Sequence, residues 1–193
     1  MDLMFIGGGQ DRQQEAASKD LAARTGSLVR EAVDLGAVVL AVCGGYQLMG
    51  NRYVAADGSE LAGIGIFDAE TRHPGPRVQR CVGDVVADWE DKLLVGFENH
   101  GGRTYLGPGS EALARIVSGT GNNGDDGSEG ARNGLAFGTY LHGSLLPKNP
   151  HFADFLLEAA LQRKHPGAKL DPLDDSEEWA AHRAALSKAG VRA

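Results

Sequence analysis

Cys43 stands where a cysteine can act as a nucleophile. It follows the apolar run Ala37–Val42, whose β-branched residues are typical of a buried strand, and two glycines come directly after it. A strand that turns tightly into a helix presents its last side chain clear of the sheet, and small neighbours relieve the strain of the turn. The start of a helix also favours the thiolate. The alternative is a buried structural cysteine. That is how we interpret Cys81, because it lies in a strand-like run without a glycine turn.

A thiolate nucleophile needs a base, and His142 is the histidine that the sequence favours. It follows the predicted strand Leu135–Leu141 and precedes a glycine. The site residues of α/β proteins gather where strands end, which is the position of His142. His100, followed by two glycines, is the rival. Three further histidines fall in the helical C-terminal third of the chain, where we expect surface positions: His151, His165 and His182.

Backbone amides can complete such a site. A turn of three glycines, Gly7–Gly9, follows the predicted strand Leu3–Ile6. We predict that the amides of Gly8 and Gly44 form an oxyanion hole, since one such donor contributes about 2.7–4 kcal/mol in a transition state. The alternative is a phosphate-binding turn, but the sequence contains neither the ATP-binding pattern that ends in Gly-Lys-Ser/Thr nor the dinucleotide pattern. We therefore expect no cofactor and no metal in this chain.

The composition of the chain limits its class. Its 193 residues suit one domain, 1–193, and we expect a core of about 3–161 with a helical extension over 162–193. The net charge of −7 argues against a nucleic-acid partner. No apolar stretch is long enough to cross a membrane, and the start lacks the basic segment of a secretion signal, so we expect a cytoplasmic protein. The 28 glycines are about twice the usual share, and many lie in the proposed site loops.

Alternating strands and helices at the start of the chain predict an α/β fold. Ser18 can cap a helix that ends before Gly36. The polar, glycine-rich segment Gly119–Gly134 predicts a long surface loop. The remaining predicted strands are Ile64–Phe67, Val78–Val86, Leu93–Phe97 and Ala114–Val117, and the remaining helices are Phe152–Leu161 and Ser176–Lys188.

Four segments of the chain, taken in order, resemble a known family. They are Gly7–Arg12, Cys43–Gly50, Gly96–Thr104 and Gly138–Gly143. Together they resemble class I glutamine amidotransferases of the cobyric-acid-synthase-like branch, and within it the GatD-type subunits of lipid II isoglutaminyl synthase. The resemblance implies a three-layer, flavodoxin-like fold with a mixed, mainly parallel sheet. Family members have one more strand and helix before Phe5, so we expect a fold without that first strand and helix.

The resemblance also implies a reaction. Cys43 would attack the side-chain amide of glutamine, His142 would protonate the leaving ammonia, and water would resolve the thioester to glutamate. The residues that would line the glutamine pocket are Gln47, Asn99, His100 and Gly101. Arg77 matches the family arginine that holds the α-carboxylate of the substrate, a role that suits a guanidinium fork. Arg72 is the nearby rival.

The same resemblance implies a partner subunit. The ammonia would pass to a Mur-ligase-like (MurT-type) chain in a heterodimer, and that chain would use ATP and Mg²⁺ to amidate the D-glutamate of lipid II in peptidoglycan synthesis. The alternatives are a glutaminase subunit for another synthase, such as a corrinoid type, and a non-catalytic relative. Most class I members carry a glutamate two residues after the histidine, where this chain has Ser144. The site is then either a dyad or takes its acid from elsewhere, and our hypothesis is that the partner supplies it.

Overall fold

Cys43 follows a strand in the middle of the central sheet. The computed structural model describes residues 2–9 and 11–192, and Gln10 of the first family-like segment lies outside them. Among the described residues, this sheet has four strands in the order β1-β2-β12-β11. They are β1 (Leu3–Ile6), β2 (Val38–Val42), β12 (Ala136–Thr139) and β11 (Ala131–Asn133). The first three run parallel and β11 is antiparallel, so the central sheet is mixed and mainly parallel.

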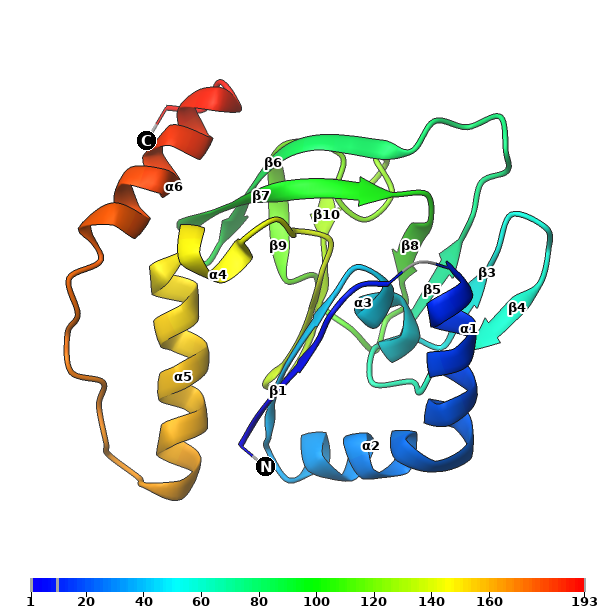
Figure 1. Ribbon diagram of the computed structural model, residues 1–193, viewed down its shortest axis with the longest axis horizontal. Helices are drawn as coiled ribbons and strands as arrows, with labels where there is room; N and C mark the ends of the chain where they lie inside the picture. Colours follow the sequence, from blue (N-terminus) through cyan, green and yellow to red (C-terminus); the bar gives the residue numbers. More distant parts are fainter. Residues whose placement is uncertain (1, 10, 193) are drawn as a thin grey trace.

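Helices cover both faces of the central sheet. All five residues of β2 are buried, and they alternate between two hydrophobic clusters. Leu40 and its even-numbered neighbours pack with α5 (Pro150–Lys164), while Val39 and Ala41 pack with α2 (Gly26–Asp34) and α3 (Gly44–Met49). Figure 1 shows α5 on one side of the sheet and α3 on the other. The α/β class and the three-layer arrangement are confirmed.

Two further four-stranded sheets lie beyond the central one in the described part of the chain. One is antiparallel, in the order β10-β9-β6-β7, with β6 (Cys81–Trp89), β7 (Lys92–His100), β9 (Ala114–Ser118) and β10 (Ser128–Glu129). The other has the order β4-β3-β5-β8, with β3 (Arg52–Val54), β4 (Glu60–Ala62), β5 (Ala69–Arg72) and β8 (Arg103–Leu106).

Strand β7 is joined to the segment that carries His142. The backbone amide of Phe97 donates to the carbonyl of His142 over 2.9 Å, and the amide of His142 donates back over 3.0 Å. Because β7 ends at His100, this pair of bonds brings the end of β7 to the edge of the central sheet where Cys43 lies. Residues far apart in the sequence therefore meet at one place.

The helix predicted to begin at Ser18 starts earlier and is bent. The chain forms α1 (Asp11–Asp20), a π-helical turn (Leu21–Thr25) and then α2. Figure 1 shows α1 and α2 running in different directions. Ser18 is no cap; it lies inside α1, where its hydroxyl donates to the carbonyl of Ala62 over 2.8 Å. A Cβ at Gly26 would lie 2.5 Å from the carbonyl oxygen of Leu21, so the bend depends on glycine.

Two predictions are wrong, the surface loop over 119–134 and the strand over Ile64–Phe67. In both segments the structure buries residues whose burial the sequence pattern does not indicate. Segment 119–134 is not a surface loop: it contains β10 and β11, and Asn122 and Glu129 are fully buried in it. The side chain of Asn122 donates to the carbonyl of Gly130 over 2.8 Å and accepts its amide over 3.0 Å, which replaces the water that a polar loop would need. Ile64–Phe67 forms a buried bend instead of a strand.

The C-terminal third is helical, as predicted, but two of its histidines are not on the surface. α4 (Leu145–Lys148) and α5 are followed by α6 (Ser176–Lys188). His182 is buried, with Nδ1 2.7 Å from the carbonyl oxygen of Lys148. The ring of His151 stacks on those of Trp89 and Trp179. No helix among the described residues is both long and apolar enough to span a membrane.

Candidate active site

Cys43 occupies a strained turn between β2 and α3. Its φ and ψ are 53° and −111°, a conformation that a non-glycine residue keeps only where its surroundings enforce it. Its amide donates to the carbonyl of Thr139 on the neighbouring strand over 2.9 Å, and its carbonyl accepts the amide of Gln47 over 3.0 Å. These bonds fix the turn from both sides and leave the thiol partly exposed at the end of β2.

Both residues predicted for the oxyanion hole lie beside Cys43. A Cβ added to Gly8 would lie 3.1 Å from Cβ and 3.7 Å from Sγ of Cys43, so the backbone of Gly8 passes directly next to the thiol. Gly44 is the first residue of α3, and amides of a first helical turn have no acceptor inside the helix. A Cβ on Gly44 would overlap the side chain of Gln14, which packs over the turn.

His142 and Cys43 line the same cavity, which has a volume of about 360 Å³. Nε2 of His142 accepts the amide of Asn99 over 3.1 Å, and this bond orients the ring. Burial lowers the pKa of His142 below its usual value, positive charge on His100 lowers it further, and Glu98 opposes both. A neutral ring that accepts at Nε2 carries its proton on Nδ1, so Nε2 is the atom that can take a proton. His142 can act as a base towards the thiol once Nε2 exchanges the amide of Asn99 for it.

A second cavity, of about 380 Å³, opens on the other side of Cys43 and shares Gly9, Cys43 and Asn99 with the first. All four residues predicted to line the glutamine pocket line it: Gln47, Asn99, His100 and Gly101. The side chains that the sequence did not single out are Gln14, Tyr53, Ala56, His73 and Arg80. Cys43 therefore stands between a cavity with a histidine base and a larger polar pocket.

The wall of this second cavity, the polar pocket, is held by a chain of buried hydrogen bonds. Oε1 of Gln47 accepts Nε2 of Gln14 over 3.0 Å, and Nε2 of Gln47 donates to the hydroxyl of Tyr140 over 3.0 Å. That hydroxyl lies 2.6 Å from Oγ1 of Thr104, which in turn lies 2.7 Å from Oγ1 of Thr71. These contacts fix the amide of Gln47, so its role is to shape the wall.

The structure does not bring Arg77 to the pocket. Arg77 is exposed and lines neither cavity, and Arg72 pairs with Glu70 along the same strand. Arg80 lines the pocket instead: its guanidinium donates to Oδ1 and to the carbonyl oxygen of Asn99, each over 3.1 Å. The role of Arg77 stays a prediction from the family pattern, and the arginine that lines the pocket lies three residues further along the same loop.

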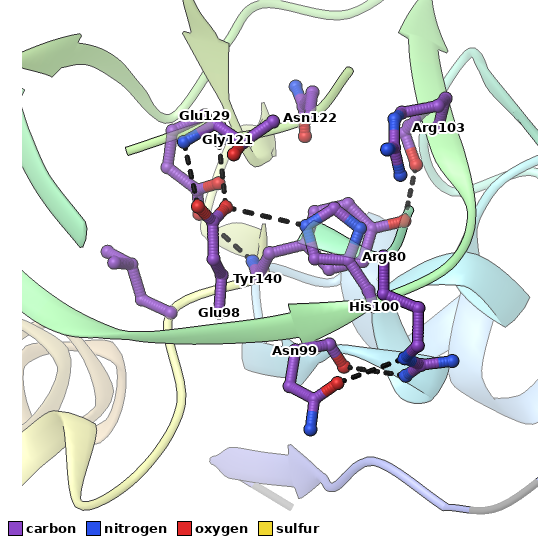
Figure 2. Close-up of polar contacts among 12 residues, drawn as sticks. Arg80, Glu98, Asn99, His100, Arg103, Gly121, Asn122, Glu129 and Tyr140 are labelled. Carbon is purple, nitrogen blue, oxygen red and sulfur yellow. Dashed lines mark hydrogen bonds and ion pairs between the residues drawn. The ribbon is translucent and has the colours of Figure 1, made fainter. Parts of the chain in front are cut away.

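Beneath the pocket lies a buried acid–histidine pair (Figure 2). The ring of His100 stacks on that of Tyr140, with centroids 3.7 Å apart and 12° between the planes. Nδ1 of His100 is 2.8 Å from the carbonyl oxygen of Gly102, and Nε2 is 3.5 Å from Oε2 of Glu98. Behind Tyr140, Oε1 of Glu129 accepts the amide of Tyr140 over 3.0 Å, and burial raises the pKa of Glu129.

Cys81, Glu98 and His100 form the one grouping of metal-ligand residue types among the described residues, with donor atoms within 4.8 Å of one another. The two carboxylate oxygens of Glu98 already accept the amides of Thr120 and Gly121, over 2.7 and 3.0 Å. Burial raises the pKa of the Cys81 thiol. We therefore interpret the grouping as a buried ion pair next to a neutral thiol.

Sequence reasoning missed several residues of the site for different reasons. Gln14 lies on α1, which was predicted to begin later. Glu98 and Tyr140 stand inside the family-like segments, Glu98 directly before Asn99 and Tyr140 two residues before His142. An acid and a phenol next to apolar residues were the available signal.

The fold and the site define a glutamine amidotransferase domain, and comparison with known proteins agrees. Residues 1–150 match the CobB/CobQ-like glutamine amidotransferase domain. A structure described as a crystal structure of glutamine amidotransferase superposes with a TM-score of 0.63 at 19% identity, covering 83% of this chain and 79% of that one. At that identity the likeness concerns the fold alone.

Curated relatives place the chain more closely. It is 41% identical over 191 residues to "Lipid II isoglutaminyl synthase (glutamine-hydrolyzing) subunit GatD" of Staphylococcus aureus, covering 97% of this chain and 75% of that protein. It is 39% identical to the subunit of the same name from Streptococcus pneumoniae, covering 85% of this chain and 63% of that protein. A cobyric acid synthase of Pelotomaculum thermopropionicum is 36% identical but is matched over only 24% of its length. The chain belongs to the CobB/CobQ-like glutamine amidotransferase family.

Proposed function

We propose that this chain hydrolyses L-glutamine to L-glutamate and ammonia, with Cys43 as the nucleophile and His142 as the base. The observation that carries the proposal is the position of Cys43, whose strained turn stands between the His142 cavity and the polar pocket. A nucleophile that shares one cavity with a base and also lines a substrate pocket is the arrangement that covalent catalysis needs.

The proposed reaction has two halves. Cys43 gives its thiol proton to His142, and Sγ attacks the side-chain carbonyl carbon of glutamine. The oxyanion that forms is stabilised by the amides of Gly8 and Gly44. Collapse breaks the carbon–nitrogen bond, and His142 gives its proton to the ammonia that leaves. In the second half, His142 takes a proton from water, the hydroxide attacks the thioester, and glutamate leaves as the thiol of Cys43 re-forms.

Arg80 is our candidate for holding the α-carboxylate of glutamine. It is the arginine that lines the pocket, and Asn99 already orients its guanidinium. A planar fork of donors matches a carboxylate better than a point charge does. Gln47, His100 and Gly101 are proposed to complete the pocket around the substrate.

We propose that the ammonia passes to a Mur-ligase-like, MurT-type partner in a cytoplasmic heterodimer. That partner would bind ATP and Mg²⁺, activate the carboxylate of D-glutamate in lipid II and amidate it. The names of the two GatD relatives support this acceptor, and the chain covers 75% and 63% of their lengths. A corrinoid-type synthase is the second candidate, supported by weaker matches, and the hydrolysis step would be the same for both.

The partner is also our proposed source of the acid that completes a triad. Ser144 stands two residues after His142, in a left-handed turn with φ of 66°, and it is exposed. Within the described part of the chain, no carboxylate is hydrogen-bonded to His142. An orienting carboxylate contributes about 10⁴-fold in a serine triad. We expect glutamate release to rise at least tenfold when the MurT-type chain is added, and equal rates with and without it would contradict the idea.

The function itself is tested by glutamate release. The wild-type chain, assayed with its partner, should release glutamate and ammonia in equal amounts from L-glutamine, and Cys43→Ala should release neither. Circular dichroism and thermal denaturation of both chains check that the variant is folded. Release by Cys43→Ala at a comparable rate would refute the nucleophile, and no release by the folded wild-type complex would favour a non-catalytic relative.

A further inference from the structure

The charge of His100 can be worked out from its contacts. The residue is 2% exposed although it forms part of the pocket wall. Its Nδ1 lies 2.8 Å from the carbonyl oxygen of Gly102. A carbonyl oxygen only accepts, so Nδ1 carries a proton. Nε2 faces Oε2 of Glu98 at 3.5 Å, without a hydrogen-bond partner among the described residues. Whether the ring is charged therefore depends on a proton at Nε2.

Glu98 decides that question. Its two oxygens accept the amides of Thr120 and Gly121, which favours the ionised carboxylate. Burial opposes this, yet the contact with His100 and the hydrogen bonds from Thr120 and Gly121 together lower the pKa of Glu98. A lone pair on Nε2 would point at a carboxylate oxygen in a low-dielectric interior, which is repulsive, whereas a proton there makes an attractive ion pair. Figure 2 shows Glu98 between the amide of Gly121 and the ring of His100.

The stacking partner of His100 also favours a cation. Tyr140 lies flat against the ring, and the face of an aromatic ring attracts positive charge. The other titratable groups around the pair come from several elements: Cys81 of β6, Glu129 of β10, Arg103 of β8, Arg80 ahead of β6 and His142 after β12. The pKa of the Cys81 thiol and that of the Glu129 carboxyl are both raised by burial. Glu98 is thus the acid that faces Nε2.

We propose that Glu98 is a positioning residue that holds His100 as an imidazolium cation in the wall of the pocket. The effect of this cation on catalysis rests on the proposed function. A fixed positive charge there repels a proton on His142, so the base stays neutral in neutral solution. The same charge favours the thiolate of Cys43 and an anionic end of the substrate.

The charge of His100 can be read without any turnover, by ¹⁵N NMR of the histidine rings. We expect both ring nitrogens of His100 to be protonated at pH 7.5 in the wild type. In Glu98→Gln, Nε2 should lose its proton. Glu129→Gln is the matched control, since it replaces another buried acid of the cluster with an amide, and it should leave His100 doubly protonated. A neutral His100 in the wild type overturns the proposal, whether or not Glu98→Gln folds. Bound zinc in the purified wild type at one equivalent would also overturn it, because the metal would occupy Nε2.

The catalytic consequence is read from the pH dependence of glutamate release. In Glu98→Gln, the acid limb of kcat/KM should move to higher pH, because His142 loses the repulsion of the cation, and this loss outweighs that of the opposing attraction of the Glu98 carboxylate. Glu98→Asp, which keeps the charge, should move it less. An unshifted acid limb in Glu98→Gln would contradict this role. If His100 is charged in the wild type but the wild type releases no glutamate, the proposed function is refuted and the charge assigned to His100 stands.

Discussion

Two histidines on either side of Asn99 show how one residue type is given two roles. His142 lies at the end of the central sheet, partly buried in an open cavity, and its Nε2 accepts the amide of Asn99. His100 follows Asn99 in β7, where it is buried against Glu98 and Tyr140. Burial without an acid partner favours a neutral ring, and burial with one favours a cation. The difference teaches that the surroundings of each ring, more than its place in the fold, separate a base from a fixed charge.

The largest effect should come from replacing the neutral histidine. His142→Asn keeps a polar group of similar size but removes the base, so kcat for glutamate release should fall by about 10²–10⁴. KM should change little, because His142 does not line the polar pocket. Steady-state assays of the complex with its partner measure both constants. A kcat within tenfold of the wild type would show that another group acts as the base.

A smaller effect should come from replacing Arg80, the arginine that lines the polar pocket together with His100. Arg80→Ala should raise KM for glutamine by roughly 10- to 100-fold, since a charge-assisted bond to a carboxylate contributes about 1.5–3 kcal/mol. The matched variant is Arg77→Ala, three residues earlier in the same loop, and its KM should stay within twofold of the wild type. If KM rises in Arg77→Ala and stays unchanged in Arg80→Ala, then Arg77 holds the α-carboxylate and the substrate lies outside the polar pocket.

A third histidine tests whether burial without an acid favours the neutral ring. Burial lowers the pKa of His151 to about 4, and no acid forms an ion pair with it among the described residues. Its pKa in the unfolded chain is near 6.5. Between those values the unfolded chain binds more protons, so the free energy of unfolding should fall as the pH drops from about 6.5 to 4. His151→Phe should flatten this pH dependence, as measured by denaturant unfolding at several pH values. An unchanged slope would show that His151 is charged in the folded protein.

The chemistry of the site was easier to predict than its walls. Cys43 and His142, which line one cavity in the structure, were predicted because each follows a strand and precedes glycine, a local pattern. The glutamine-pocket residues came from segments whose family pattern is distinctive. Arg80 and Gln14 could not be found in this way, because their roles depend on how a loop and a bent helix fold over the pocket. The charge of His100 depends on Glu98 two residues away and on amides of Thr120 and Gly121, contacts that no local pattern encodes.

The fold also has some features that the local sequence predicts and others that depend on tertiary contacts. The run 37–42 is apolar throughout because β2 is buried on both faces, and such a pattern is hard to mistake. Segment 119–134 is polar, and its burial depends on side-chain bonds such as those of Asn122. The bend between α1 and α2 depends on a close approach at Gly26 to the backbone of Leu21. Tertiary contacts, which no local sequence window contains, decide both features.

The identity of the nucleophile is the central claim, and one labelling experiment tests it most directly. The chain in complex with its partner is treated with a glutamine analogue whose side-chain amide is replaced by a chloromethyl ketone, and the modified peptide is identified by mass spectrometry. We predict one adduct, on Cys43, that forms more slowly when L-glutamine is present. Cys81 is buried beside Glu98 and should remain unmodified. An adduct on Cys81, or labelling of Cys43 that L-glutamine does not slow, would contradict the proposed site.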